Sequence, residues 1–152
     1  MKEWYSDTDI GIFFNHKPNT NMLDPENGKT QKEKDLIARN PFVNNTSLIV
    51  TLIDNIKEAS YNFTIPKGFR WDGATIPSWI WCIVGSKTNP KFKNPSLIHD
   101  YMCNNKYIVN YDRNFSSKIF RGMLLKAGVN KIKANIMYKA VDLYQMTQGW
   151  GK

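Results

Sequence analysis

The chain has few of the residues that build disulfide frameworks or metal sites. It contains two cysteines, Cys82 and Cys103, and two histidines, His16 and His99. Neither cysteine belongs to a CxxC pair, so we expect buried thiols, with one Cys82–Cys103 bridge as the alternative. No HExxH motif and no glycine-rich phosphate loop occurs in the sequence. These absences exclude the zinc peptidases and the nucleotide-binding enzymes that depend on such motifs.

Long apolar runs are also missing. No stretch approaches the roughly 18 consecutive apolar residues of a membrane-spanning helix. The first residues, MKEWYSDTDIGIFF, lack the apolar core of a signal peptide. The sequence therefore predicts a protein made in the cytoplasm, with neither a signal peptide nor a transmembrane segment.

Arginine is scarce, although the chain is basic. Four arginines and seventeen lysines stand against thirteen acidic residues, which gives a formal net charge of +8. No basic run, arginine cluster or zinc-finger spacing accompanies this charge, so the sequence argues against nucleic acid as the partner. A diffuse lysine excess is typical of a surface that favours solubility. On charge alone, an anionic membrane surface is an equally good partner.

The 152 residues suit a single domain. Residues 1–46 are expected to form an N-terminal extension with a surface loop over 15–29 and a short helix. Thr30 and Glu33 stand at capping-box spacing for this helix, which must end before Pro41. From residue 47 the segments SLIVTLID and SYNFTIPKGF are β-branched and aromatic, which predicts two strands in a hairpin. Residues 47–152 are therefore expected to form an α+β domain.

Three helices are predicted after the hairpin. The first has Asn94 as its cap and Pro95 at its first position. The second runs from about Arg113 to Gly128. The third carries an apolar face at helical spacing, formed by Ile132, Ile136, Met137, Ala140, Val141 and Tyr144. Strands first and helices afterwards predict an α+β fold, in which a small antiparallel sheet or hairpin is followed by three helices.

His99 and Asp100 stand side by side in NPSLIHDYMCNN, near the start of the first of these helices. Successive side chains on a helix point about 100° apart, so the two residues would serve different duties. His99 could act as a general base toward water, and Asp100 could hold a hard cation such as calcium. A second acid would have to orient the imidazole and stabilise its charged form. The alternative is a half-buried histidine that bonds to the backbone.

Four ordered blocks resemble a family of small uncharacterised proteins of bacteriophages and bacteria, a domain of unknown function. The blocks are GFRWDGATIP at 68–77, HDYMC at 99–103, RNFSSKIF at 113–120 and AGVNKIKANIMYKAV at 127–141. They are similar to the family pattern GFxxDGA[ST]xP, HDxxY, RxxADxxF and GV, over roughly residues 60–144. The resemblance implies a phage protein made in the host cytoplasm and built into a virion. Other phage structural proteins or a host protein would be its partners.

The His-Asp helix and the helix after it also resemble phospholipases of the A2 type. That resemblance implies His99 as the base, Asp100 as the calcium ligand and an aspartate of the next helix that orients the histidine. This sequence has Ser117 at the position of that aspartate, and Cys103 at the tyrosine of HDxxY. A serine cannot stabilise an imidazolium as a carboxylate does. Weak or absent hydrolase activity is the expectation.

Two aspartates could replace the missing acid. Asp112 would have to lie in the loop before the second helix and fold back toward His99. Asp72, in FRWDGATIP, would make a turn with its carboxylate on backbone amides. The functional alternative is that Asp72 points at His99 from a neighbouring loop. The same cleft would be lined by Trp71, Thr75 and Tyr101.

Three hypotheses follow. The leading one is a small phage-type protein on a lipase-like His-Asp helix scaffold with a degenerate centre, acting as a virion, tail or host-interaction component. The serine at position 117 motivates it. The rival is a cation-dependent hydrolase of lipids or other esters, in which His99 is the base and Asp72 or Asp112 orients it. A nucleic-acid-binding accessory protein rests on charge alone.

Overall fold

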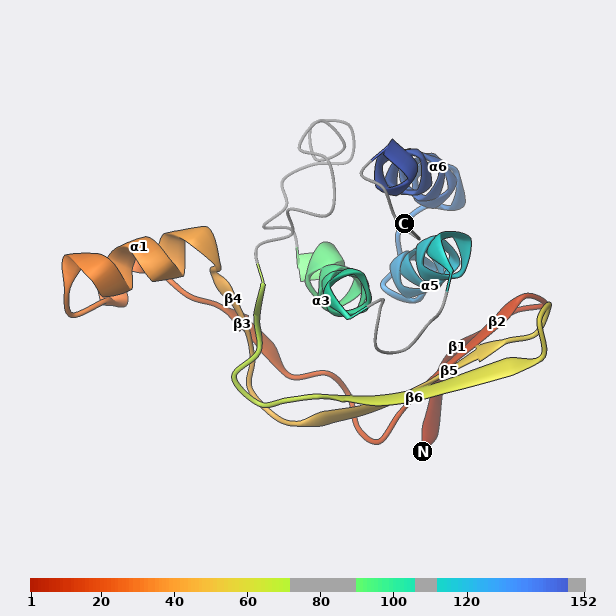
Figure 1. Cartoon of the computed structure of the whole chain (residues 1–152), viewed down its shortest axis with the longest axis horizontal. Helices are drawn as coiled ribbons and strands as arrows, with labels where there is room; N and C mark the ends of the chain where they lie inside the picture. The colour runs from red at the N-terminus through yellow and green to blue at the C-terminus, as the bar shows by residue number, and fades with distance from the viewer. Residues whose placement is uncertain (72–89, 106–111, 148–152) are drawn as a thin grey trace.

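The computed structural model describes residues 1–71, 90–105 and 112–147, and Figure 1 shows their arrangement. The strands are β1 (Lys2–Ser6), β2 (Ile10–Phe14), β3 (Thr20–Met22), β4 (Phe42–Asn44), β5 (Leu48–Asp54), β6 (Ala59–Ile65) and β7 (Arg70–Trp71). The helices are the 3-10 turn η1 (Pro25–Asn27), α1 (Gln31–Arg39), α3 (Pro90–Asn104), α5 (Arg113–Lys126) and α6 (Lys131–Thr147). Antiparallel sheets with helices packed on them confirm the predicted α+β fold.

The main sheet has four antiparallel strands in the order β1-β2-β5-β6. The predicted hairpin is its β5–β6 half, with Leu48 opposite Ile65 and Asp54 opposite Ala59. Alternate residues of β5, Leu48 to Asp54, are buried, as period-two patterning requires. Asp54 closes the hairpin because its carboxylate accepts the amides of Ile56 and Lys57 at 3.0 and 3.1 Å. This Asx turn explains why the chain reverses after Asp54.

Residues 1–46 hold more strand structure than the sequence predicted. Strands β1 and β2 extend the main sheet, while β3 and β4 pair with β7 in a second sheet of order β3-β4-β7. The prediction of a loop over residues 15–29 was wrong at β3 and η1, because three polar residues such as TNM carry no recognisable period. The helix prediction was right. Thr30 caps α1 by accepting the amide of Glu33 at 3.1 Å, and α1 ends at Arg39.

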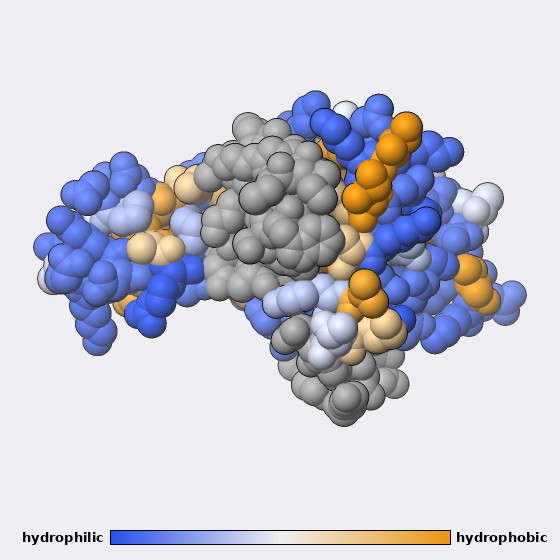
Figure 2. Space-filling model, turned by 90° about the horizontal axis from the view of Figure 1, so that it is seen from above, coloured by the Kyte–Doolittle hydropathy of each residue, from blue (hydrophilic) through white to orange (hydrophobic). Residues whose placement is uncertain are grey.

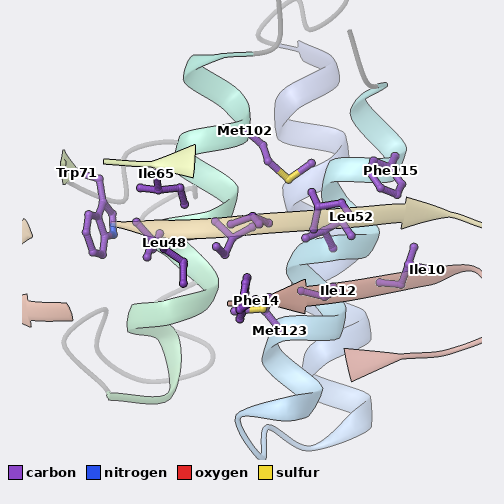
Figure 3. Close-up of a cluster of buried hydrophobic side chains, with 14 of the residues drawn as sticks. Ile10, Ile12, Phe14, Leu48, Leu52, Ile65, Trp71, Met102, Phe115 and Met123 are labelled. Carbon is purple, nitrogen blue, oxygen red and sulfur yellow. The ribbon is translucent and has the colours of Figure 1, made fainter. Parts of the chain in front are cut away.

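Three helices form two layers on the main sheet. Helices α3 and α5 lie over one face, and α6 packs on α5 away from the sheet (Figure 1). Side chains from β2, β5, α3 and α5 meet in one buried cluster that includes Ile12, Leu52, Met102 and Met123 (Figure 3). Helix α5 comes very close to the sheet at Gly122, where a Cβ would lie 2.8 Å from the Tyr5 ring. Only glycine permits this approach without displacing the tyrosine.

The predicted start of the first helix was wrong. Helix α3 begins at Pro90, so Asn94 and Pro95 lie inside it. Asn94 instead joins α3 to β3, since its Oδ1 accepts a hydrogen bond from the Thr20 hydroxyl at 3.0 Å. An Asn-Pro pair is a good signal for the start of a helix. Helix α3 nevertheless begins earlier in the chain, because tertiary contacts override the local preference.

The predicted apolar face of the third helix was also partly wrong. The buried residues of α6 are Ala134, Met137, Val141 and Gln145. Ile132 and Ile136, which the sequence assigned to the core, are exposed. Helix α6 carries apolar residues on two faces, and helical spacing alone does not tell which face meets α5. None of the described helices is long and apolar enough to cross a membrane.

Candidate functional site

His99 and Asp100 lie in the most deeply buried stretch of α3. Residues 95–100 are all buried, so this part of the helix is enclosed on every side. The exposed fraction is 0% for His99 and 2% for Asp100. The two side chains point about 100° apart, yet both are inside the protein. The histidine was expected to be half-buried in the non-catalytic alternative, and it is fully buried.

Two described neighbours of the His99 imidazole are an aromatic ring and a thiol. Its ring centroid lies 5.2 Å from that of Phe120 in α5. The Cys103 sulfur, one helical turn further on, is 3.7 Å from Nδ1, and Cys103 is present as a thiol. Burial lowers the pKa of His99 to about 4, so the ring is neutral near pH 7. An imidazole with this pKa is a weak general base at neutral pH.

Ser117 takes part in a network that joins α5 to α6. Its hydroxyl is buried and donates to Oδ1 of Asp142 at 2.9 Å. Arg113 Nε donates to the same oxygen at 3.1 Å, and Nη2 lies 3.5 Å from Oδ2. A carboxylate therefore does stand beside position 117, but α6 supplies it and Arg113 balances its charge. We call these three residues the Arg113–Asp142–Ser117 network.

Sequence reasoning missed Asp142. It lies in KAVDLYQM, where no motif or spacing relates it to His99 or to Ser117. One signal was available. Relative to the pattern RxxADxxF, α5 has the arginine at Arg113 but a serine in place of the aspartate four residues later, which is the spacing of ion pairs on a helix. A partner for that arginine had to come from another element, and the sequence does not say which.

Asp112 does lie just before α5, as its candidate role required, but its contacts are structural. It is the N-cap of α5, where Oδ1 accepts the amide of Phe115 at 2.6 Å. Its other oxygen pairs with Lys57 of the β5–β6 turn. Partial burial raises the pKa of Asp112, but the bonds from Lys57 and Phe115 outweigh burial and lower it. Its described contacts fasten the hairpin to α5 and do not include His99.

Trp71 and Tyr101, two of the predicted cleft residues, pack α3 against the sheets. Trp71 is buried, and its Nε1 donates to the Ser96 hydroxyl at 2.9 Å. The Tyr101 hydroxyl donates to the carbonyl of Thr64 in β6 at 3.1 Å. Phe69 contacts both aromatic rings, with centroids 6.0 Å from Trp71 and 5.3 Å from Tyr101. The structure thus brings these two residues together, as parts of the core.

The remaining candidates fall on undescribed parts of the chain. Asp72, Thr75 and Cys82 lie outside the described residues. Within residues 1–71, 90–105 and 112–147, no three His, Cys, Asp or Glu side chains are grouped so that they could hold a metal ion. A calcium site at Asp100 would therefore draw ligands from elsewhere in the chain. No cavity described among these residues is lined by His99 or Asp100.

Comparison with known proteins identifies a family for this chain. A family model described as a protein of unknown function, DUF1353, matches residues 50–141. The chain belongs to this family. The DUF1353 match begins within β5 and ends within α6, so it contains the His-Asp helix and position 117. The resemblance to a domain of unknown function is confirmed, while strands β1 to β4 precede the matched region.

One relative from the curated proteins is the uncharacterized protein y4jT of Sinorhizobium fredii (strain NBRC 101917 / NGR234). It is 40% identical over 82 residues, which make up 53% of this chain and 23% of the relative. The chain thus spans less than a quarter of the length of this relative. No solved structure matches the chain.

Proposed function

We propose that this DUF1353 protein is a non-catalytic, phage-type host-interaction component that binds an anionic membrane surface through α6. It keeps the helix framework of a His-Asp hydrolase, with the histidine fully buried. The observation that carries the proposal is an exposed apolar face on α6 with lysines beside it. The similarity of the four sequence blocks to proteins of bacteriophages supports the phage setting.

The interior of the scaffold supports a structural role for the His-Asp pair. His99 is sealed beside Phe120 with a pKa of about 4. The carboxylate next to Ser117 is neutralised by Arg113, which leaves it poorly suited to stabilise a distant imidazolium. Asp112 is used as a helix cap. The described groups at the positions of a hydrolase's proton relay instead make contacts that hold α3, α5, α6 and the hairpin together.

Four apolar residues are exposed on the outer face of α6, with Lys139 between the second and the third. Ile132, Ile136, Leu143 and Met146 are 70%, 45%, 56% and 49% exposed. Their spacings of four, seven and three residues place them on one side of the helix. Figure 2 looks down on the side where α6 lies, and apolar atoms form a stripe there between polar residues. We call these four residues the α6 stripe.

The positive charge of α6 indicates which kind of surface the α6 stripe would bind. Lys131, Lys133 and Lys139 are exposed on the same helix. Asp142, the acidic residue of α6, forms an ion pair with Arg113. A second copy of the chain would set lysine against lysine, whereas an anionic bilayer accepts both the apolar stripe and the lysines. Each lysine near such a surface contributes about 1 kcal/mol.

The test is co-sedimentation with vesicles of phosphatidylcholine alone or mixed with phosphatidylglycerol. We expect binding to the anionic vesicles that weakens as salt is added. Replacing Ile136→Ser and Leu143→Ser together should lower the partition coefficient about tenfold or more, because two apolar side chains no longer leave water. The matched control is Leu36→Ser with Ile56→Ser, which removes two exposed apolar residues outside α6.

Two outcomes would overturn the membrane role. One is equal loss of binding in the control and in the α6 variant, which would reflect general surface hydrophobicity. The other is no binding to either vesicle, which would leave the α6 stripe to a protein partner in the particle or the host.

The second candidate is the cation-dependent hydrolase, and one observation favours it. Ser117 stands where the resemblance to the phospholipases expects the orienting aspartate, and its hydroxyl donates to the Asp142 carboxylate at 2.9 Å. In this alternative His99 would be the base and Asp100 would hold calcium with ligands from outside the described residues. Fatty-acid release from the same vesicles, with calcium present and then chelated, separates the two candidates.

A further inference from the structure

A cavity of about 390 Å³ lies at one end of the main sheet, away from the His-Asp helix. The start of β1, the end of β2, the residues just after β2 and the last residue of α5 form its walls. The family match begins at residue 50, so Lys126 is the only wall residue inside the matched region. The cavity is therefore a feature that the N-terminal strands add to this chain.

Three lysines converge on this cavity. They are Lys2, Lys17 and Lys126, and none of them forms an ion pair with a described residue. The Lys126 ammonium lies 5.4 Å from the centroid of the Trp4 ring, in a cation–π contact. The acid in the wall is Glu3, whose carboxylate accepts a hydrogen bond from Ser6 at 2.6 Å. Glu3 balances one of the three lysines, so the cavity wall keeps a surplus of positive charge.

His16 adds to this surplus. One ring nitrogen lies 2.8 Å from the carbonyl oxygen of Lys17, and the other lies 2.8 Å from that of Ser47. A carbonyl oxygen only accepts, so these contacts favour the imidazolium, in which both ring nitrogens donate. They raise the pKa of His16. His16 is therefore a further basic side chain in the cavity wall.

The remaining wall is aromatic. The Trp4 and Phe14 rings lie with centroids 5.5 Å apart, tilted by 48°. A volume of about 390 Å³ corresponds to roughly 13 waters at about 30 Å³ each. This size suits a ligand of about ten to fifteen heavy atoms, at the small end of the range for ligand pockets.

We propose that this cavity binds a small anionic amphiphile: a carboxylate or phosphate head on an apolar body of about ten carbons. The head meets Lys2, Lys17 and Lys126, and the body lies against Trp4, which packs on the buried Phe14 ring. The lysines supply charge that the protein leaves unbalanced, and the aromatic wall supplies the apolar contact. This site is separate from the α6 stripe and does not depend on the membrane role.

The test is calorimetric titration with decanoate and with decyl phosphate, each below its micelle concentration. We expect both to bind at least about tenfold more tightly than decyltrimethylammonium and decanol, which carry the same chain with the opposite charge or none. The two anionic probes show whether a carboxylate or a phosphate head is preferred. Inorganic phosphate, which lacks the chain, should bind far more weakly than decyl phosphate.

Paired variants locate the site. Lys17→Gln with Lys126→Gln should weaken decanoate binding about tenfold. Lys29→Gln with Lys32→Gln removes the same charge from exposed positions around the start of α1 and should leave binding unchanged. Thermal melting of both pairs checks that they fold. Equal weakening by both pairs would mean diffuse attraction, and no weakening by the first pair would place the ligand elsewhere. Either result overturns the proposal, as does inorganic phosphate binding as tightly as decyl phosphate.

Discussion

Lowering the pH from 6.5 to 4.5 is expected to reduce the free energy of unfolding by about 2 kcal/mol through His99 alone. Burial lowers the pKa of His99 to about 4 in the folded protein, whereas the unfolded chain titrates near 6.5. Between these values the unfolded state binds more protons, so acidification favours it. Well above pH 6.5 both states are neutral at this residue, and the full stability is present.

Urea unfolding between pH 4.5 and 7.5 measures this effect. His99→Gln, which cannot titrate, should flatten the dependence between pH 4.5 and 6.5. NMR of the unaltered chain provides a check if that variant is too unstable, because only two histidines are present. The ring signals of His99 should not titrate above about pH 5. A native His99 that titrates near 6.5 would contradict the account and would make it a competent base.

His16 should act with the opposite sign. Its pKa is raised in the folded state by the carbonyls of Lys17 and Ser47. The stability that it contributes is fully present below the unfolded pKa near 6.5, and it is lost as the pH rises through the folded pKa. His16→Gln should therefore change the upper end of the stability curve and leave the His99 region unchanged.

Asp142→Ala is expected to lower the free energy of unfolding by about 2 kcal/mol. The change leaves the Arg113 charge and the Ser117 hydroxyl without the acceptor that they share. The figure is smaller than for a fully buried pair because the Arg113 and Asp142 side chains are 29% and 21% exposed. Urea unfolding near pH 7 measures it, and Asp35→Ala on the exposed helix α1 is the control.

Moving the acid provides a sharper test. The double change Ser117→Asp with Asp142→Ser places the carboxylate four residues after Arg113 on α5, at the spacing that helical ion pairs use. It should recover most of the stability that Asp142→Ala loses. Ser117→Asp alone sets two carboxylates together and should raise the pKa of one of them. No recovery in the double variant would show that the network does not work as a charge-and-acceptor unit.

Local rules in the sequence located several elements well. The Thr30 cap, the β5–β6 hairpin and the helix from Arg113 to Lys126 follow from side chains that act on neighbours in the chain. The β1 and β2 strands were missed because β1 pairs only with β2, and β2 joins the sheet by pairing with β5 about forty positions later in the chain. The inner face of α6 was misassigned because both of its faces are apolar. In both cases tertiary contacts determine the structure, and the local sequence pattern does not.

At the candidate site, too, local geometry was predicted from the sequence and tertiary contacts were not. Adjacency and helical geometry predicted that His99 and Asp100 would point in different directions, and the family blocks directed attention to position 117. The sequence did not reveal that α6 delivers Asp142 to Ser117, since such a contact depends on how two helices pack. It also did not reveal the burial that lowers the pKa of His99 to about 4.

Fatty-acid release from mixed phosphatidylcholine and phosphatidylglycerol vesicles tests most directly whether the His-Asp helix is structural. The protein is compared with His99→Gln, first with calcium and then with a chelator. The account predicts that the unaltered protein binds the vesicles and releases no more fatty acid than His99→Gln in either condition. Release that needs calcium and disappears in His99→Gln would contradict it, and the protein would then be a hydrolase whose orienting acid is to be sought at Asp142 and Asp72.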